Sequence, residues 1–127
     1  MGFLPAIRDA SRAPRDNYMP AAPHRTDRIP MPIRMKVYHR GPETLVAACD
    51  EDLLGRTFRE AGLRLEVSAF YDGDVVSEEQ FVAHLRLATI GNFVGRETVE
   101  AAQRAGFVGE DGLLWIEGVP HAQMVVA

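Results

Sequence analysis

Apolar and polar positions become regular only after about residue 34. Residues 35–40 alternate, which is typical of a half-buried strand, and residues 44–49 form a second short apolar run. The dipeptide Gly41-Pro42 lies between the two runs and favours a turn. Together the three segments predict a β-hairpin.

A helix is predicted next, over residues 50–61. Asp50 is a residue type that caps helix N-termini, and the two acidic residues after it suit a first helical turn. Apolar residues then recur at the spacing of one buried helix face, at Leu54, Phe58 and Ala61.

The middle of the domain predicts one strand and one helix. Residues 63–71 alternate over their whole length and predict a single strand. Ser77 and Gln80 have the spacing of a capping box, which predicts a helix start at Ser77. This helix is expected to end near Gly91.

The last third predicts a corner, a helix and two strands. Residues 88–95 (ATIGNFVG) bracket Asn92 with glycines and are interpreted as a corner between two helices, where a ligand can approach the backbone closely. The second helix is predicted over residues 96–105. Strands are expected at residues 113–117 and 122–126.

The predicted order is therefore β-β-α-β-α-α-β-β. Strands that come in adjacent pairs favour an antiparallel or mixed sheet, so we expect an α+β domain with about three helices packed mainly on one face. This single compact domain is predicted to span residues 35–127. Residues 1–34 hold six of the eight prolines and no apolar periodicity, which indicates a disordered Pro/Arg-rich tail or a mis-assigned start.

Charge and composition narrow the class of partner. Residues 1–34 carry six Arg against three Asp, and residues 35–127 carry eight Lys and Arg against fifteen Asp and Glu. Since the domain is acidic, non-specific binding to duplex DNA is not expected. No apolar run reaches the roughly 20 residues that span a bilayer, so no membrane partner is expected. The single cysteine, Cys49, fits a reducing compartment, and a cytoplasmic location is predicted.

His121 is the most promising polar residue for function. It follows Pro120, whose fixed φ holds the turn still, and it titrates near neutral pH. Gln123 is expected on the same side of the last strand, where the pair suits a base edge, a carboxylate or a peptide group. The alternative is that the ring of His121 only caps a turn.

Metal and cofactor chemistry receive little support. His39, His84, His121 and Cys49 have no ligand spacing, and neither a metal nor a cofactor is predicted. Cys49 is interpreted as a small core residue.

Three segments in the same order resemble DUF424, an archaeal family of unknown function. They are VAACDEDLLGRTFREAGLRLEVSAFYDG, ATIGNFVGRETVEAAQRAGFV and GVPHAQMVV. The resemblance covers about residues 35–127 and implies a compact α/β-type domain with a link to ribosome or tRNA work. The matching positions are Cys49, Asp50, Leu54, Gly55, Asn92, Gly95, Gly118, Pro120, His121 and Gln123.

Three function hypotheses follow. The first is a non-enzymatic binding module in archaeal translation, with RNA, the ribosome or a translation protein as partner and a surface formed by His121, Gln123 and Asn92, together with Asp50. The second is a small enzyme with His121 as general acid or base, oriented by Asp50. The third is an adaptor that pairs a short edge strand, such as the last one, with a partner.

Two surface features would separate the binding hypotheses. A flat surface with clustered Arg40, Arg56 and Arg59 would favour RNA, and an apolar patch beside an open edge would favour the adaptor. The sequence predicts no reaction or substrate and leaves the oligomeric state open.

Overall fold

The computed structural model describes residues 31–126. Residues 1–30 of the predicted tail lie outside the described residues. The first strand begins at Ile33, which is buried, so the last two residues of the predicted tail belong to the sheet.

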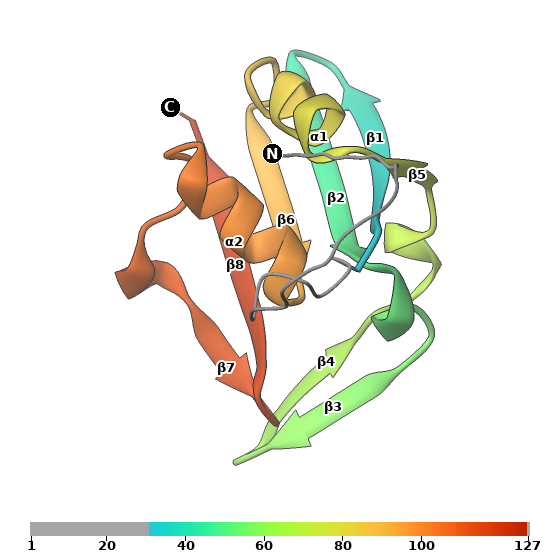
Figure 1. Ribbon diagram of the computed structural model, residues 1–127, viewed down its shortest axis with the longest axis vertical. Coiled ribbons are helices and arrows are strands. Elements are labelled where there is room, and N and C mark those ends of the chain that lie inside the picture. Colours follow the sequence, from blue (N-terminus) through green and yellow to red (C-terminus); the bar gives the residue numbers. More distant parts are fainter. Residues whose placement is uncertain (1–30, 127) are drawn as a thin grey trace, which may run out of the picture. The chain divides into compact units, whose positions relative to one another are not determined.

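Eight strands and two α-helices lie within residues 31–126 (Figure 1). The strands are β1 (Ile33–Arg40), β2 (Glu43–Asp50), β3 (Thr57–Glu60), β4 (Leu63–Glu66), β5 (Asp74–Val76), β6 (Ile90–Val94), β7 (Leu114–Ile116) and β8 (Val119–Val125). The α-helices are α1 (Glu78–Leu85) and α2 (Arg96–Arg104), and short 3₁₀ helices are η2 (Glu51–Leu53), η3 (Ala69–Tyr71) and η4 (Glu110–Gly112).

Six of these strands form one mixed sheet in the order β5-β1-β2-β6-β8-β7. All neighbours are antiparallel except β2 and β6, which are parallel. A parallel pair needs a long crossover, and the chain from η2 through α1 supplies it. Strands β3 and β4 form a separate hairpin, which extends across the lower end of the view in Figure 1 towards the turn between β7 and β8.

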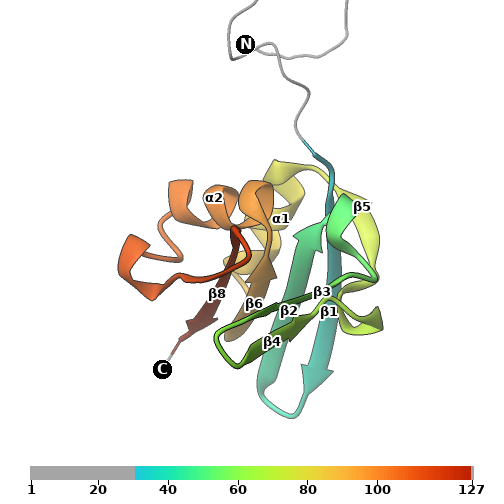
Figure 2. The same ribbon diagram turned by 90° about the horizontal axis from the view of Figure 1, so that it is seen from below.

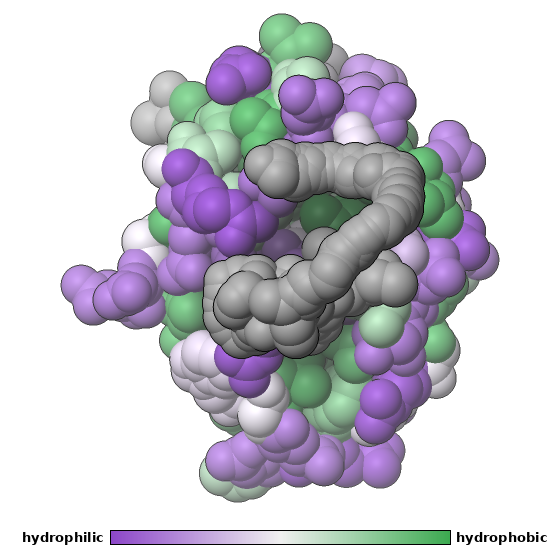
Figure 3. Space-filling model, in the orientation of Figure 1, coloured by the Kyte–Doolittle hydropathy of each residue, from purple (hydrophilic) through white to green (hydrophobic). Residues whose placement is uncertain are grey.

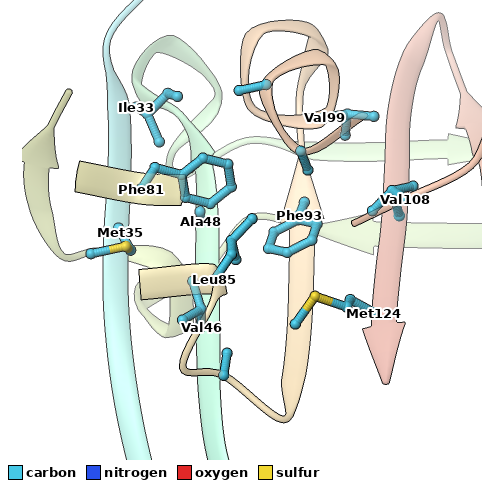
Figure 4. Packing of buried hydrophobic residues seen from close by; sticks show 14 residues of the cluster. Ile33, Met35, Val46, Ala48, Phe81, Leu85, Phe93, Val99, Val108 and Met124 are labelled. Carbon is cyan, nitrogen blue, oxygen red and sulfur yellow. The ribbon is translucent and has the colours of Figure 1, made fainter. Parts of the chain in front are cut away.

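One face of the sheet packs against α1 and α2. Phe81 and Leu85 of α1 are completely or almost completely buried against Phe93 of β6, and the rings of Phe81 and Phe93 meet edge to face at 5.5 Å (Figure 4). Because the ring of Phe93 lies over Gly91, a Cβ at Gly91 would come within 2.4 Å of it. The other members of this core cluster are Ile33, Met35, Val46, Ala48, Ala88, Val99, Ala101, Ala102, Val108, Ala122 and Met124.

The opposite face packs against the β3–β4 hairpin and η3, so the sheet lies between two layers. Figure 2 shows the hairpin crossing the strands of the sheet. Side chains alternate along each strand, and the odd-numbered positions of β2 therefore face the hairpin. This second core is formed by Ala47, Cys49, Leu53, Phe58, Leu65, Val67, Tyr71, Val94 and Ile116.

The predicted helix over residues 50–61 is wrong, because only η2 forms before the chain turns into β3. Phe58 is buried between the exposed Thr57 and Arg59, which also fits a strand of period two. The turn to β4 is made by Ala61 and Gly62, with φ of 53° and 84°, as a two-residue hairpin turn of twisted strands requires. The predicted strand 63–71 is correspondingly shortened to β4.

The predicted corner at residues 88–95 is also wrong, since this segment is β6, an interior strand of the sheet. Gly91 serves close packing under Phe93 rather than a turn between helices. With two α-helices among the described residues instead of three, the predicted element order is corrected to a mostly-sheet α+β fold.

The first hairpin and the start of α1 form as predicted, but α1 ends at Leu85 and not near Gly91, which lies in β6. The first hairpin pairs β1 with β2 in register around Gly41-Pro42. The capping box of α1 is complete: Ser77 Oγ accepts from Gln80 N–H over 3.0 Å, and Gln80 Oε1 accepts from Ser77 N–H over 2.9 Å. No helix among residues 31–126 has the length and apolarity to cross a membrane.

Candidate functional site

Asn92 lies on β6, on the face of the sheet that the hairpin partly covers. Its Oδ1 accepts a hydrogen bond from the hydroxyl of Tyr71 over 2.7 Å and another from Nε2 of His121 over 2.8 Å. The three side chains come from η3, β6 and β8. We call Tyr71, Asn92 and His121 the Asn92 triad.

The triad sets the protonation of His121. A carbonyl oxygen only accepts hydrogen bonds, so Nε2 carries the proton and Nδ1 of the neutral ring is an acceptor. Burial lowers the pKa of His121 below its ordinary value, which favours this neutral form. Among residues 31–126, neither Nδ1 of His121 nor the amide nitrogen of Asn92 has a hydrogen-bond partner.

Tyr71 is the buried member of the triad. Its side chain is only 5% exposed, and burial, with a smaller effect of Cys49, raises the pKa of Tyr71 to about 12. The hydroxyl therefore remains a donor to Asn92 at neutral pH. Its ring also meets that of Phe70, its neighbour in η3, edge to face at 5.1 Å.

Polar and apolar side chains continue from the triad towards the end of the sheet. Gln123 is exposed and stands opposite Asn92 in the β6–β8 register. The next row of side chains crosses four strands and is half-buried or exposed, in contrast to the fully buried Val94 and Cys49. This row consists of Tyr38, Leu45, Ile90 and Val125. We call the row, together with Asn92, His121 and Gln123, the open face.

An aromatic pair closes the β1 side of the open face. The rings of Tyr38 and Phe70 stack with centroids 5.0 Å apart, and the Tyr38 hydroxyl donates to the carbonyl of Phe70 over 2.8 Å. Lys36 also lies over the ring of Tyr38, with its Nζ 5.5 Å from the ring centroid. The open face is therefore bounded by fixed rings rather than by mobile side chains.

Asp50 has a different task, on the opposite face of the sheet. Its carboxylate accepts from the N–H groups of Glu97 and Thr98 over 3.1 and 2.9 Å, and from the Thr98 hydroxyl over 2.8 Å. Burial raises the pKa of Asp50, and the Thr98 and Glu97 bonds oppose that rise. Asp50, the last residue of β2, thus caps the N-terminus of α2. It does not cap a helix over residues 50–61, as the sequence predicts.

Gly95 makes this tertiary cap possible. Its φ is 108°, and a Cβ there would lie 2.4 Å from Cγ of Asp50. Alternation along β2 and β8 places Asp50 and His121 on different faces, so the structure brings His121, Asn92 and Gln123 together and leaves Asp50 apart.

Cys49 and the remaining histidines do not add a reactive centre to the open face. Burial, followed by the charge of Asp50, raises the pKa of Cys49 to about 12, so it remains a thiol in the core. His84 Nδ1 lies 2.9 Å from the carbonyl of Gln80 on α1. Across the described part of the chain, no group of three His, Cys, Asp or Glu side chains is placed to hold a metal ion.

The arginines named for RNA binding do not form one cluster. Arg40 ends β1 opposite Glu43 beside the first hairpin turn. The backbone N–H of Arg59 donates to Oε2 of Glu117 in the β7–β8 turn over 2.6 Å, at the other end of the sheet. Arg56 lies over the ring of Phe58 at 5.0 Å.

Sequence reasoning missed Tyr71 as a member of the site. Its place in an alternating run predicts a core residue, and it is indeed buried. Its bond to Asn92, however, joins residues 21 positions apart through the packing of η3 under the sheet. No local pattern signals such a contact.

The comparisons with known proteins agree with one another. The family model described as "Protein of unknown function (DUF424)" matches residues 38–126. The chain is also similar to a solved structure, that of an uncharacterized conserved protein from Methanopyrus kandleri, with 28% sequence identity and a TM-score of 0.64. That match covers 73% of this chain and 90% of the other. None of the curated proteins compared with the chain matches it significantly.

Proposed function

Since the chain belongs to the DUF424 family, whose description gives no activity, we propose from its geometry that it is a non-enzymatic module that binds another protein. The recognition surface is the open face. The observation that carries the proposal is the double hydrogen bond to Oδ1 of Asn92 from Tyr71 and His121.

This arrangement supports recognition of a peptide group. With Oδ1 of Asn92 occupied, its amide nitrogen remains a donor and Nδ1 of His121 remains an acceptor, and Gln123 beside them offers both. A backbone peptide unit has one donor and one acceptor and is matched by such a set. The adjoining apolar row gives the partner's side chains a surface to bury.

RNA is the less favoured partner. The domain is acidic, and Arg40, two residues beyond Tyr38 on the same face, lies at the opposite end of the sheet from Arg59. Phosphate contacts require gathered positive charge, which the open face does not supply.

An enzymatic role is less favoured, because the carboxylate expected to orient His121 lies elsewhere. The carboxylate of Asp50, the residue expected to orient His121, is bonded to the N-terminus of α2 on the other face. Asn92 instead fixes the ring with a neutral amide oxygen, which does not stabilise a charged imidazolium as a carboxylate would. A held, neutral acceptor suits recognition better than proton transfer.

Translation is the setting that the family resemblance implies, and it forms part of the proposal. The solved relative from Methanopyrus kandleri supports an archaeal origin. The partner is accordingly sought among archaeal ribosomal proteins and translation factors.

The test is affinity capture from native archaeal lysate with the full 127-residue chain, with and without nuclease. We expect the chain to capture a protein, and we expect this capture to persist after nuclease treatment. For Asn92→Ala or Gln123→Ala the affinity of capture should fall at least about tenfold, which corresponds to roughly 1.4 kcal/mol of binding free energy. Gln103→Ala on α2 makes the same side-chain change on the other face and should leave capture unchanged. Complete loss on nuclease treatment, or equal capture by all variants, would overturn the proposal.

A further inference from the structure

The ladder between β6 and β8 determines which backbone groups of β8 face away from the sheet. Gly95 N–H donates to the Pro120 carbonyl over 2.9 Å, and Val126 N–H donates to the Thr89 carbonyl over 2.8 Å. Both pairs follow the β6–β8 register, in which every second residue bonds to the same neighbour. Even-numbered residues of β8 therefore bond to β6, and odd-numbered residues direct their N–H and C=O groups to the other side.

The neighbour on that other side, β7, is too short to use all of these groups. It is in register only with Val119–His121 of β8. Beyond its end, the N–H and C=O groups of Gln123 and Val125 face outward and have no backbone partner among residues 31–126. Four hydrogen-bonding groups are thus available in a row beside the open face.

No side chain of β8 itself carries a charge. Every residue from Val119 to Val126 is uncharged at neutral pH. Val125 is 76% exposed, and Val126 after it and Leu114 and Trp115 of β7 are exposed apolar residues as well. The guanidinium of Arg96 lies 5.7 Å from the centroid of the Trp115 ring.

The opposite edge of the sheet is different. Strand β5 covers β1 only at Ile33–Met35, and the rest of β1 carries Lys36 and Arg40, followed by Pro42. Charged residues and proline on an edge strand discourage pairing with other chains. The molecule therefore protects the free part of β1 and leaves the free part of β8 unprotected.

We infer that β8 is the strand at which this protein pairs with an extended, uncharged segment of its partner, in line with β7. The inference rests on the proposed function and names the partner's class: a segment with apolar or small polar residues at alternate positions. Its residues on the hairpin side would lie beside Gln123, Val125 and Leu114, and main-chain hydrogen bonds would supply the affinity.

A second copy of the chain fits this edge poorly. Pairing two β8 strands about a twofold axis can use only Gln123 and Val125 of each copy, because Leu114 already occupies the outward side of His121. The β7 strand of each copy lies on the same edge and limits how far the two β8 strands can overlap. A partner segment without its own β7 has no such obstacle.

The first test uses a strand of alternating Val and Thr, joined to the C-terminus of the full chain by a Gly/Ser linker that lets it fold back at high effective concentration. Amide hydrogen exchange is measured by NMR. We expect the Gln123 and Val125 amides to exchange at least about tenfold more slowly with the tethered strand, since each gains a protected hydrogen bond. A matched strand with proline at alternate positions should give no protection. Unchanged exchange at Gln123 and Val125, or equal protection at Val37 and His39 of β1, would overturn the inference.

The second test uses Val125→Pro, which removes an outward N–H and no bond to β6. Continued slow exchange at Ala122 and Met124 shows that the variant is folded. If the variant does not fold, the tethered-strand measurement decides the inference. We expect at least about tenfold weaker capture of the partner in the lysate experiment. If Asn92→Ala loses capture and Val125→Pro retains it, the pairing inference fails and the proposed function stands. Concentration-dependent protection of the same amides in the chain without a tether would instead assign the edge to a second copy and overturn the inference.

Discussion

Asp50 and Asn92 are polar residues on the neighbouring strands β2 and β6, and their hydrogen bonds give them different roles. Asp50 is 6% exposed and its carboxylate is fully engaged by α2, so it is structural. Asn92 has its oxygen engaged and its nitrogen available, so it holds His121 and still presents a donor. Buried polar groups are stable only when paired, as Asp50 is, whereas the half-buried Asn92 keeps a donor that a ligand can use.

The cap of α2 gives a test of the role of Asp50. Asp50→Ala removes the acceptor of three hydrogen bonds at the helix N-terminus and should lower the free energy of unfolding by about 3 kcal/mol. Asp50→Asn keeps an acceptor oxygen and avoids a buried charge, so it should cost about 1 kcal/mol or less. Urea denaturation monitored by circular dichroism measures both. Equal losses for the two variants would contradict this account of the cap.

His121 gives a pH dependence whose sign follows from its lowered pKa. In the unfolded chain the pKa is near 6.5, and in the folded chain burial lowers it. The folded state therefore binds the proton less readily, so stability present above pH 6.5 or so is lost as pH falls through that value. In His121→Gln, which keeps a neutral donor for Asn92, the free energy of unfolding should decrease less between pH 7.5 and pH 5.5. The comparison is made by urea denaturation, and an identical decrease in both proteins would refute it.

At the scale of elements, local signals were sufficient where both partners of an interaction are close in sequence. The capping box of α1 joins Ser77 and Gln80, and it was predicted correctly. The cap of α2 joins Asp50 to residues 47 and 48 positions later, which no local pattern can reveal. Phe58 is compatible with helical and strand spacing alike, and only its packing under the sheet selects β3.

The candidate site divides in the same way. Residue type singles out His121, Gln123 and Asn92, but the predicted settings are wrong: His121 lies within β8 and not in a turn, and Asn92 lies within β6 and not in a corner between helices. The register of β6 and β8 places the three residues together. Tyr71 is missed because its contact with Asn92 depends on how η3 packs. The sequence therefore indicates polar residue types but neither the strand pairing nor the tertiary contact that assembles them.

The β3–β4 turn gives a test at this scale. Ala61 has φ of 53°, which costs a residue with a Cβ about 1 kcal/mol and which Asn and Gly tolerate. Ala61→Asn should therefore raise the free energy of unfolding by about 0.5–1 kcal/mol in urea denaturation. Glu117, with φ of 52°, is the matched case in the β7–β8 turn, but its carboxylate accepts from Arg59 N–H. Glu117→Asn should consequently give no gain, and a gain of the same size at both turns would contradict the assigned role of Glu117.

For the whole molecule, the sheet separates two kinds of surface. Seen from the helix side, hydrophilic and hydrophobic residues are interspersed (Figure 3). On the hairpin side, the layer over the sheet leaves the row from Val125 to Tyr38 half-buried or exposed. A partially covered sheet with one unprotected edge is the arrangement expected of a strand-pairing module.

If the charged side chains on the free part of β1 prevent that strand from pairing with other chains, their removal should create a second edge that pairs. The double variant Lys36→Val and Arg40→Val exposes an apolar edge at Val37–His39, where β5 no longer covers β1. We expect it to self-associate through β1 in sedimentation velocity, at concentrations where the wild type does not. Lys36→Glu with Arg40→Glu removes the positive charge but keeps charged side chains on the edge, so it should sediment as the wild type does. Association of the glutamate variant as well would show that positive charge in particular, rather than a charged edge in general, keeps β1 unpaired, and it would weaken the contrast from which pairing at β8 is inferred.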